Sequence, residues 1–357
     1  MSSRAPWWRF WAVYVLAGAE LWAIWRGLAW FLPFIGFVLV PLLDFPETRL
    51  DGHYPDELMF RLPLILWLPS QLVIISLTNW RLAALSRSVS LLSTLGWTLS
   101  MGMILALGIN VAHELNHKTP LSYRVLARCL LIMSGYGPYA IEHNRGHHKA
   151  VGLAEDPATA RLGESFYRFF PRALCGVWGA FSKWPEVRRR LFLDTGAYLV
   201  LLQVFASGYA ALRPIDAVAT TQGRVSAYFF GLFVNVLASA LSVIQIELVN
   251  YTEHYGLCRT SSEEPITAAL SWNNHHWLSG CMLFKLEYHS DHHLHAARWY
   301  PKLHNRLEEW PQHPAGLPAM MLLALLPPLW RRVMDPLAER YRPLSRNASP
   351  TVPSPDL

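Results

Sequence analysis

Six stretches of this sequence are long and apolar enough to cross a lipid bilayer, and this feature limits the folds open to the chain. A helix needs about 20 mostly apolar residues to span the hydrocarbon core, where the backbone must satisfy its own hydrogen bonds. The predicted spans are about 8–25, 28–43, 59–78, 89–112, 191–212 and 226–250. The sequence therefore predicts an all-α integral membrane protein with six transmembrane helices.

Composition supports a membrane protein. Hydrophobic residues make up 52% of the 357 positions and charged residues only 16%, against about 25% charged in a soluble domain. The 16 tryptophans and 14 tyrosines are residue types that concentrate at bilayer interfaces. The net charge of +6 does not indicate nucleic-acid binding in so apolar a chain, because basic cytoplasmic loops explain it.

The predicted spans belong to one membrane-embedded domain, residues 1–342, followed by a disordered tail at 343–357. The segment 113–190 holds 12 Lys and Arg residues and 251–357 holds ten, whereas the loops near 80–88 and 213–225 hold two each. Because positively charged loops stay in the cytoplasm, we expect both long segments and both termini on that side. Two further apolar runs, 125–140 and 317–330, are too short or too broken to span.

Histidines gather at the predicted cytoplasmic ends of the spans. His113 and His117 are four residues apart, as are His143 and His147, so each pair lies on one face of a helix. The full set of clustered histidines is His113, His117, His143, His147, His148, His254, His289, His292 and His293. Nine neutral imidazoles are too many for one metal ion and suit two. We therefore predict a dinuclear metal site at the cytoplasmic membrane face.

Other interpretations of these histidines are a proton switch, a non-enzymatic metal carrier and a zinc protease. HELNH at 113–117 matches the HExxH pattern, in which Glu114 would be the general base. That interpretation leaves seven clustered histidines without a role. A proton switch does not need three clusters at ligand spacing beside apolar spans.

Carboxylates also lie in or beside these motifs. Metal-bound imidazoles usually donate their outer N–H to a carboxylate or carbonyl, so we expect the acidic residues to orient the histidines. The candidates are Glu114, Glu142, Glu155, Asp156, Glu253 and Asp291.

Several longer motifs resemble those of the membrane-bound non-haem di-iron alkane 1-monooxygenases. They are HELNHK (113–118), IEHNRGHH (141–148), EDPATARLGES (155–165), NYTEHYGL (250–257), LSWNNHH (270–276), YHSDHH (288–293) and PPLWRRVMDP (327–336). Xylene monooxygenases and fatty-acid desaturases use related histidine-rich sites. In two places this chain departs from the alkane hydroxylase pattern. Asn116 stands where that family usually has Gly, and Leu286-Glu287-Tyr288-His289 replaces its usual Leu-Gln-Arg-His.

The resemblance implies that the nine histidines hold two iron ions. It also implies terminal hydroxylation of medium- and long-chain n-alkanes with O2 in a bacterial inner membrane. Electrons would come from rubredoxin, which an NADH-dependent reductase reduces. The four cysteines of this chain do not form the C-x-x-C pairs of a rubredoxin site; they are Cys129, Cys175, Cys258 and Cys281. The related alternative is a hydroxylase or desaturase acting on alkyl-aromatic or fatty-acyl substrates.

A linear alkane entering from the bilayer needs a channel between the spans. Trp30, Phe34 and Gly36 in the second span and Gly108 in the fourth are our candidates for its lining. Bulky side chains would shorten such a channel, and glycines would leave room. The alternative for the glycines is ordinary close packing of membrane helices.

Overall fold

The computed structural model describes residues 7–47, 58–84, 90–213 and 220–341, and among these residues it contains helices and no β-strand. The all-α prediction is therefore confirmed for this part of the chain. The sequence-based predictions for residues 343–357 fall outside the described residues.

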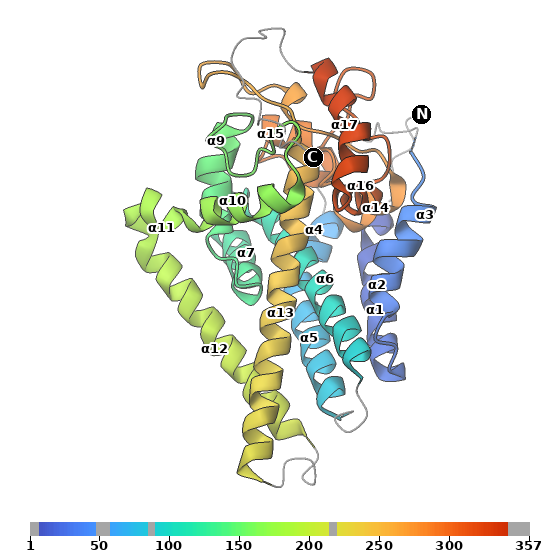
Figure 1. Cartoon of the computed structure of the whole chain (residues 1–357), viewed down its shortest axis with the longest axis vertical. Helices are drawn as coiled ribbons and strands as arrows, with labels where there is room; N and C mark the ends of the chain where they lie inside the picture. Colours follow the sequence, from blue (N-terminus) through green and yellow to red (C-terminus); the bar gives the residue numbers. More distant parts are fainter. Residues whose placement is uncertain (1–6, 48–57, 85–89, 214–219, 342–357) are drawn as a thin grey trace.

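Four helical segments are long and apolar enough to cross a membrane. The first combines α4 (Leu58–Ile65) and α5 (Trp67–Ala84); the others are α6 (Leu91–Asn116), α12 (Arg188–Leu212) with the preceding turn Pro185–Val187, and α13 (Thr221–His254). In Figure 1, α5, α6 and α13 run side by side, while α12 leans away from the bundle at its start and approaches α13 near its end. Four of the six predicted spans thus have a matching helix.

The helices at the first two predicted spans are not among these four segments. α1 (Ala12–Arg26) ends at Gly27, whose φ of +81° is a left-handed conformation that glycine adopts readily. The next helix consists of α2 (Phe31–Phe34), the π-helical turn Ile35–Leu39 and α3 (Val40–Leu43). The Phe31–Leu43 helix reaches roughly 20 Å at 1.5 Å per residue, less than the hydrocarbon thickness of about 30 Å. The first segment is longer, because the 3-10 helix Trp7–Trp11 continues directly into α1.

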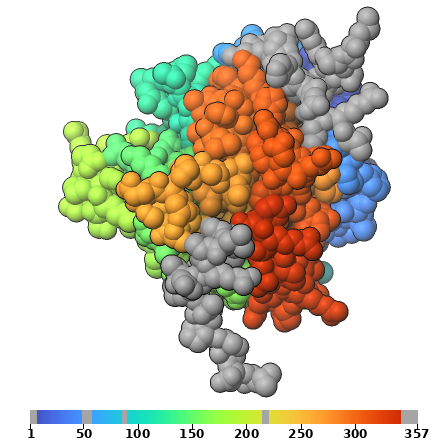
Figure 2. Space-filling view, turned by 90° about the horizontal axis from the view of Figure 1, so that it is seen from above, coloured from blue at the N-terminus to red at the C-terminus, as the bar shows by residue number. Residues whose placement is uncertain are grey.

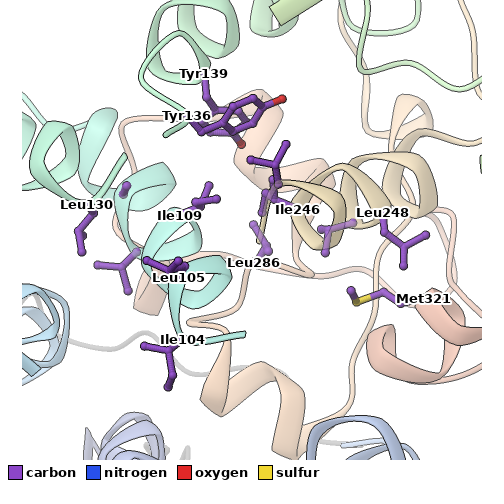
Figure 3. Packing of buried hydrophobic residues seen from close by; sticks show 14 of the residues in the cluster. Ile104, Leu105, Ile109, Leu130, Tyr136, Tyr139, Ile246, Leu248, Leu286 and Met321 are labelled. Carbon is purple, nitrogen blue, oxygen red and sulfur yellow. The ribbon is translucent and has the colours of Figure 1, made fainter. Parts of the chain in front are cut away.

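α6 is the central helix, and it packs against α5, α7 and α13. Its N-terminus is capped by Ser90, whose hydroxyl accepts a hydrogen bond from the Ser93 amide at 3.1 Å. Apolar residues occupy nearly every face, so that Trp97, Met101 and Ile109 are all buried. Figure 3 shows α6 side chains in one cluster with others from α7, α13 and the C-terminal region.

Shorter helices gather at the end of the bundle where α6 and α13 finish (Figure 1). They are α7 (Leu121–Met133), α8 (Tyr139–Glu142), α9 (His148–Ala150), α10 (Phe166–Trp178), α11 (Ala180–Lys183), α14 (Trp277–Met282), α15 (His289–Leu294), α16 (Leu317–Ala324) and α17 (Pro327–Tyr341). Short turns join some of them at His143–His147, Ala268–Leu270 and Tyr300–Lys302. Figure 2 looks onto this end, and the segments after α13, in orange and red, cover much of it. They enclose the ends of α6 and α13.

Candidate metal centre

All nine clustered histidines meet inside this covered end of the bundle. His113 lies in the last turn of α6 and His117 directly follows it, while His254 is the last residue of α13. The other six come from two short helical segments, at 143–148 and at 289–293. Segments far apart in the sequence therefore bring their imidazoles to one place.

The nitrogens form two groups. The first consists of His113, His117, His143, His148 and His292, with one ligand atom from each lying within 4.8 Å of all the others. In this group the Nε2 of His143 is 3.1 Å from that of His117 and 3.0 Å from that of His148. The Nε2 atoms of His148 and His292 are 3.2 Å apart.

The second group consists of His147, His254, His289 and His293, all of them buried, and its ligand atoms meet the same 4.8 Å limit. The Nε2 atoms of His254 and His289 are 3.0 Å apart, and those of His289 and His293 are 3.1 Å apart. His147 and His293 are paired at 3.2 Å. Neighbouring residues divide between the groups: His147 from His148, and His292 from His293.

This geometry fits two metal ions. Two imidazole nitrogens bound at right angles to one ion, each about 2.0–2.1 Å away, lie about 3 Å apart, which matches the spacing found here. The buried Nε2 of His113 has no hydrogen-bond partner among the described residues, as expected for a nitrogen that binds an ion. Burial and neighbouring imidazoles lower the pKa of His143, His289 and His292 well below the usual value. These imidazoles are therefore neutral, as a ligand must be.

Several outer nitrogens are held by acceptors, and this sets the tautomer. The Nδ1 of His147 lies 2.9 Å from Asp156 Oδ2, and that carboxylate also accepts the Thr159 hydroxyl at 2.6 Å. The Nδ1 of His289 is 3.3 Å from Glu253 Oε2, and that of His254 is 3.3 Å from the Leu270 carbonyl. With Nδ1 as donor, the Nε2 lone pair points into the group.

An apolar cavity of about 140 Å³ lies among the helices near the first group. Its walls come from α1, the Phe31–Leu43 helix, α6, α13, α14 and α16, with Leu16, Met103 and Val249 among them. A second cavity of about 10 Å³ touches His113 and His292. The two share Asn110, Leu283 and Leu286 as wall residues, so the apolar space leads to the first group.

Comparison with known proteins assigns the fold and site to a family. Residues 90–321, which contain all nine histidines, match the family described as fatty acid desaturase. The chain is 31% identical to alkane 1-monooxygenase 2 of Alcanivorax borkumensis over 331 residues, covering 88% of this chain and 83% of that protein. It is also 31% identical to the alkane 1-monooxygenase of Ectopseudomonas oleovorans over 349 residues, with 90% and 80% covered. This chain belongs to the alkane hydroxylase family.

The resemblance drawn from the motifs is thereby confirmed, and it extends beyond alkane hydroxylases. The hydroxylase component of a Pseudomonas putida xylene/toluene monooxygenase is 27% identical over 320 residues, with 86% of this chain and 80% of that protein covered. The match to the fatty acid desaturase family, over residues 90–321, includes every segment that contributes an imidazole. Family membership and the geometry of the nine histidines therefore agree.

Some of the predicted carboxylates contact an imidazole, and others pair with a basic side chain instead. Asp156 and Glu253 touch imidazoles, as described above. Glu114 instead pairs with the Lys118 ammonium at 2.8 Å and accepts the Tyr300 amide at 3.0 Å, so it anchors the segment that follows α15. Asp291 accepts two hydrogen bonds from Arg298, at 2.6 and 2.9 Å.

Among the described residues, neither Glu142 nor Glu155 forms a hydrogen bond to one of the nine imidazoles. Glu155 is exposed. Glu142 is buried below the His143–His147 turn, where a Cβ on Gly146 would come within 2.2 Å of its Oε1. Burial, followed by the nearby Asp156 charge, raises its pKa to about 7.

Only one of the four predicted channel residues lines the cavity. Gly36 does so. Trp30 and Phe34 are 41% and 51% exposed, and the Trp30 indole N–H donates to the Leu92 carbonyl of α6 at 3.0 Å. A Cβ on Gly108 would lie 2.0 Å from Gln71 Oε1, so this glycine allows α6 to pack closely against α5. Trp30, Phe34 and Gly108 do not line this cavity, and a channel role for them stays a prediction.

Three contributors to the site were not predicted from the sequence: Arg259, Tyr139 and the Leu270 carbonyl. Arg259 is buried and donates to the Val151 carbonyl at 2.9 Å and to the Lys149 carbonyl, which fixes the chain just after His148. Tyr139 stacks on the His143 ring with 5.1 Å between the ring centroids. A backbone carbonyl such as that of Leu270 cannot be recognised as a contact from the sequence. A single arginine such as Arg259 is too common a feature to predict a role in the site.

Proposed function

We propose that this chain is an alkane 1-monooxygenase that binds two iron ions and converts medium- and long-chain n-alkanes to primary alcohols. One observation carries the proposal: two groups of converging imidazoles stand at the end of an apolar cavity whose extension touches His113 and His292. Imidazole suits zinc, copper and iron alike, so the choice of iron rests on the family.

The balanced reaction is alkane, O2, two electrons and two protons giving alcohol and water. Two reduced iron ions, when bound, would activate O2, the oxidant that is needed to attack an unactivated C–H bond. The protein provides the environment. The imidazoles of both groups would hold the ions, Asp156 and Glu253 keep outer nitrogens as donors, and the apolar walls exclude water while they bind the alkyl chain.

The electrons come from a separate protein in this proposal, a rubredoxin reduced by an NADH-dependent reductase. The four cysteines stand far apart in the sequence and none forms a C-x-x-C pair, so they do not supply the paired ligands of a rubredoxin iron. Basic residues near the metal end would help an acidic donor to bind, and turnover should then weaken as salt screens the contact.

We place the chain in a bacterial inner membrane, with the metal end and both termini in the cytoplasm. The concentration of Lys and Arg in 113–190 and 251–357 supports this orientation. Both termini lie on the same side whether the chain crosses four times or six, because each number is even. The hairpin of these first two helices would complete two further crossings, with the bilayer locally thinned around the shorter Phe31–Leu43 helix.

Alkyl-aromatic substrates are the second candidate, because the xylene/toluene monooxygenase component is a relative. Fatty-acyl substrates are less favoured, since none of the described residues lining the cavity is charged and a carboxylate would find no counter-ion there. The zinc protease interpretation is weakened because Lys118 and the Tyr300 amide occupy Glu114, and because the HExxH pair sits within a group of five.

The test is turnover of the purified protein in lipid with octane, dodecane and xylene in competition. Alcohol from n-alkanes should require O2, rubredoxin, the reductase and NADH together, and the protein should contain two irons per chain. Preferential oxidation of xylene would favour the second candidate. No alcohol from any of the three substrates, with iron bound, would contradict both.

A further inference from the structure

We propose that Asn110 is a positioning residue: its side-chain amide fixes the Leu283–Leu286 turn, so that only the end carbon of a chain in the cavity reaches the first histidine group. This inference rests on the proposed function. It concerns which carbon reacts.

Asn110 stands where the two cavities meet. It lies on α6 one helical turn before His113, and its side chain is buried and lines both spaces. Its Nδ2 donates to the Leu283 carbonyl at 3.0 Å, across 173 residues of sequence. An apolar side chain would suit an alkane better at this position, so the amide has a reason to be there other than contact with the substrate.

The turn that Asn110 holds has an unfavourable backbone. Phe284 and Lys285 have φ angles of +55° and +52°, and they are the two non-glycine residues with positive φ among those described. Side chains disfavour this left-handed region, so the turn needs outside ties to keep its shape.

Three kinds of tie hold this turn. The first kind is local backbone hydrogen bonds: the Lys285 amide donates to the Gly280 carbonyl at 2.9 Å and the Leu286 amide to the Leu283 carbonyl at 3.2 Å. The buried Lys285 ammonium donates to the Leu303 carbonyl at 3.2 Å. The hydrogen bond from Asn110 is the tie that connects the turn to α6, the helix that also carries His113.

The shape of the turn matters because the second cavity is so small. Leu283 and Leu286 line both cavities, so their position sets the width of the junction. The space beyond it, about 10 Å³, is close to the smallest cavity that holds one water molecule. A methyl group is of similar size, whereas a methylene with chain on both sides needs more room. The fixed turn therefore presents the chain end.

The test compares Asn110→Leu with Gln245→Leu. Both replace an amide in the cavity wall by an apolar side chain of similar size, but the Gln245 amide donates to the Leu241 carbonyl of its own helix at 3.0 Å and not to the turn. With dodecane, Asn110→Leu should lower the ratio of 1-dodecanol to 2-dodecanol by roughly five- to tenfold, as expected for one lost neutral hydrogen bond. Gln245→Leu should keep the wild-type ratio.

Hydrogen exchange provides a readout that needs no turnover. The amides of Lys285 and Leu286 should exchange faster in Asn110→Leu than in wild type or Gln245→Leu, while bound metal stays equal in all three. If Asn110→Leu does not accumulate, Asn110→Ala removes the same donor without added bulk, and the same results are expected.

The outcomes separate this inference from the proposed function. An unchanged alcohol ratio in the Asn110 variant, with alcohol still formed, overturns the inference alone. Unchanged exchange overturns it even if the wild-type protein makes no alcohol, whereas absence of alcohol from wild type contradicts the proposed function. Equal shifts in the Gln245 and Asn110 variants would show that cavity polarity, and not the turn, selects the carbon.

Discussion

The two histidine groups are built from the same side chain, yet the protein holds them differently. In the second group, the outer nitrogens of His147, His254 and His289 meet Asp156, the Leu270 carbonyl and Glu253, and all four imidazoles are buried. In the first group, His117 and His148 are only half-buried, and His113 and His292 border the small cavity. The second group is thus anchored to the protein, whereas the first borders the small cavity that adjoins the apolar one.

The largest expected effect comes from removing one imidazole from each group. His254→Ala and His292→Ala should each reduce hydroxylation by more than about a hundredfold, since direct ligands matter more than the groups that orient them. Metal content should separate them. His254→Ala leaves three donors in its group and His292→Ala leaves four, so His254→Ala should lose more metal.

Iron per chain after gel filtration, together with dodecanol formation, measures both effects. His275→Ala is the matched control, because His275 is a neighbouring histidine outside both groups; it should keep its metal and its activity. Near-normal hydroxylation in both ligand variants would contradict the assignment of either group as a metal site.

Eight of the nine clustered histidines could be predicted to lie together from their helical spacing, and His254 from its place at the end of the sixth predicted span. Their division between two groups was not predicted, although adjacent residues such as His147 and His148 point about 100° apart on a helix and so favour different ions. The sequence predicted that carboxylates would contact the outer nitrogens of the histidines. It did not predict which ones, because nothing in the sequence distinguishes Glu253 and Asp156 from Glu114. Tertiary contacts decide which carboxylate meets an imidazole and which meets Lys118.

The next prediction tests whether the anchoring of the second group matters. Asp156→Asn removes the carboxylate charge beside His147 and should weaken metal binding at the second group by about 10- to 100-fold. Asp291→Asn should change it less than about threefold, because that carboxylate binds Arg298. Competition with a calibrated chelator measures both affinities. Equal losses in the two variants would mean that these carboxylates act through general stability.

The two groups should also respond differently to pH. Burial lowers the pKa of His147, but the Asp156 carboxylate outweighs it and the pKa ends above the usual value of about 6.5. Burial and neighbouring imidazoles lower the pKa of His143 and His292 far below that value. As pH falls through the raised pKa, a proton competes with metal for His147, while His143 and His292 remain neutral.

Metal titration of the apoprotein between pH 7.5 and 5.5 checks this. Affinity at the second group should fall by up to about tenfold per pH unit below the His147 pKa, and affinity at the first group should stay nearly constant over the range. In Asp156→Asn the second group should lose this pH dependence. A steeper fall at the first group would reverse the expected order and rule out the explanation.

The smallest expected effect concerns the cavity that leads to the first group. Size and composition suggested four channel residues, but the direction of a side chain from a membrane helix depends on its neighbours, and only Gly36 faces the cavity. A Cβ on Gly36 would come within 2.2 Å of the Met103 Cε, the flexible end of a side chain that can move. Gly36→Val should therefore fold and occupy space that an alkyl chain would fill.

Each methylene excluded from the cavity costs about 0.8 kcal/mol, or roughly a fourfold change in binding. The kcat/KM of Gly36→Val should then fall by about four- to sixteenfold for dodecane relative to octane. Gly108→Ala is the matched comparison, since its new methyl group would press on Gln71 between α5 and α6. It should lower the melting temperature and leave the chain-length preference unchanged. A shift toward octane in Gly108→Ala, with none in Gly36→Val, would mean that the alkane reaches His113 and His292 along the α5 side of α6 and not through the cavity described here.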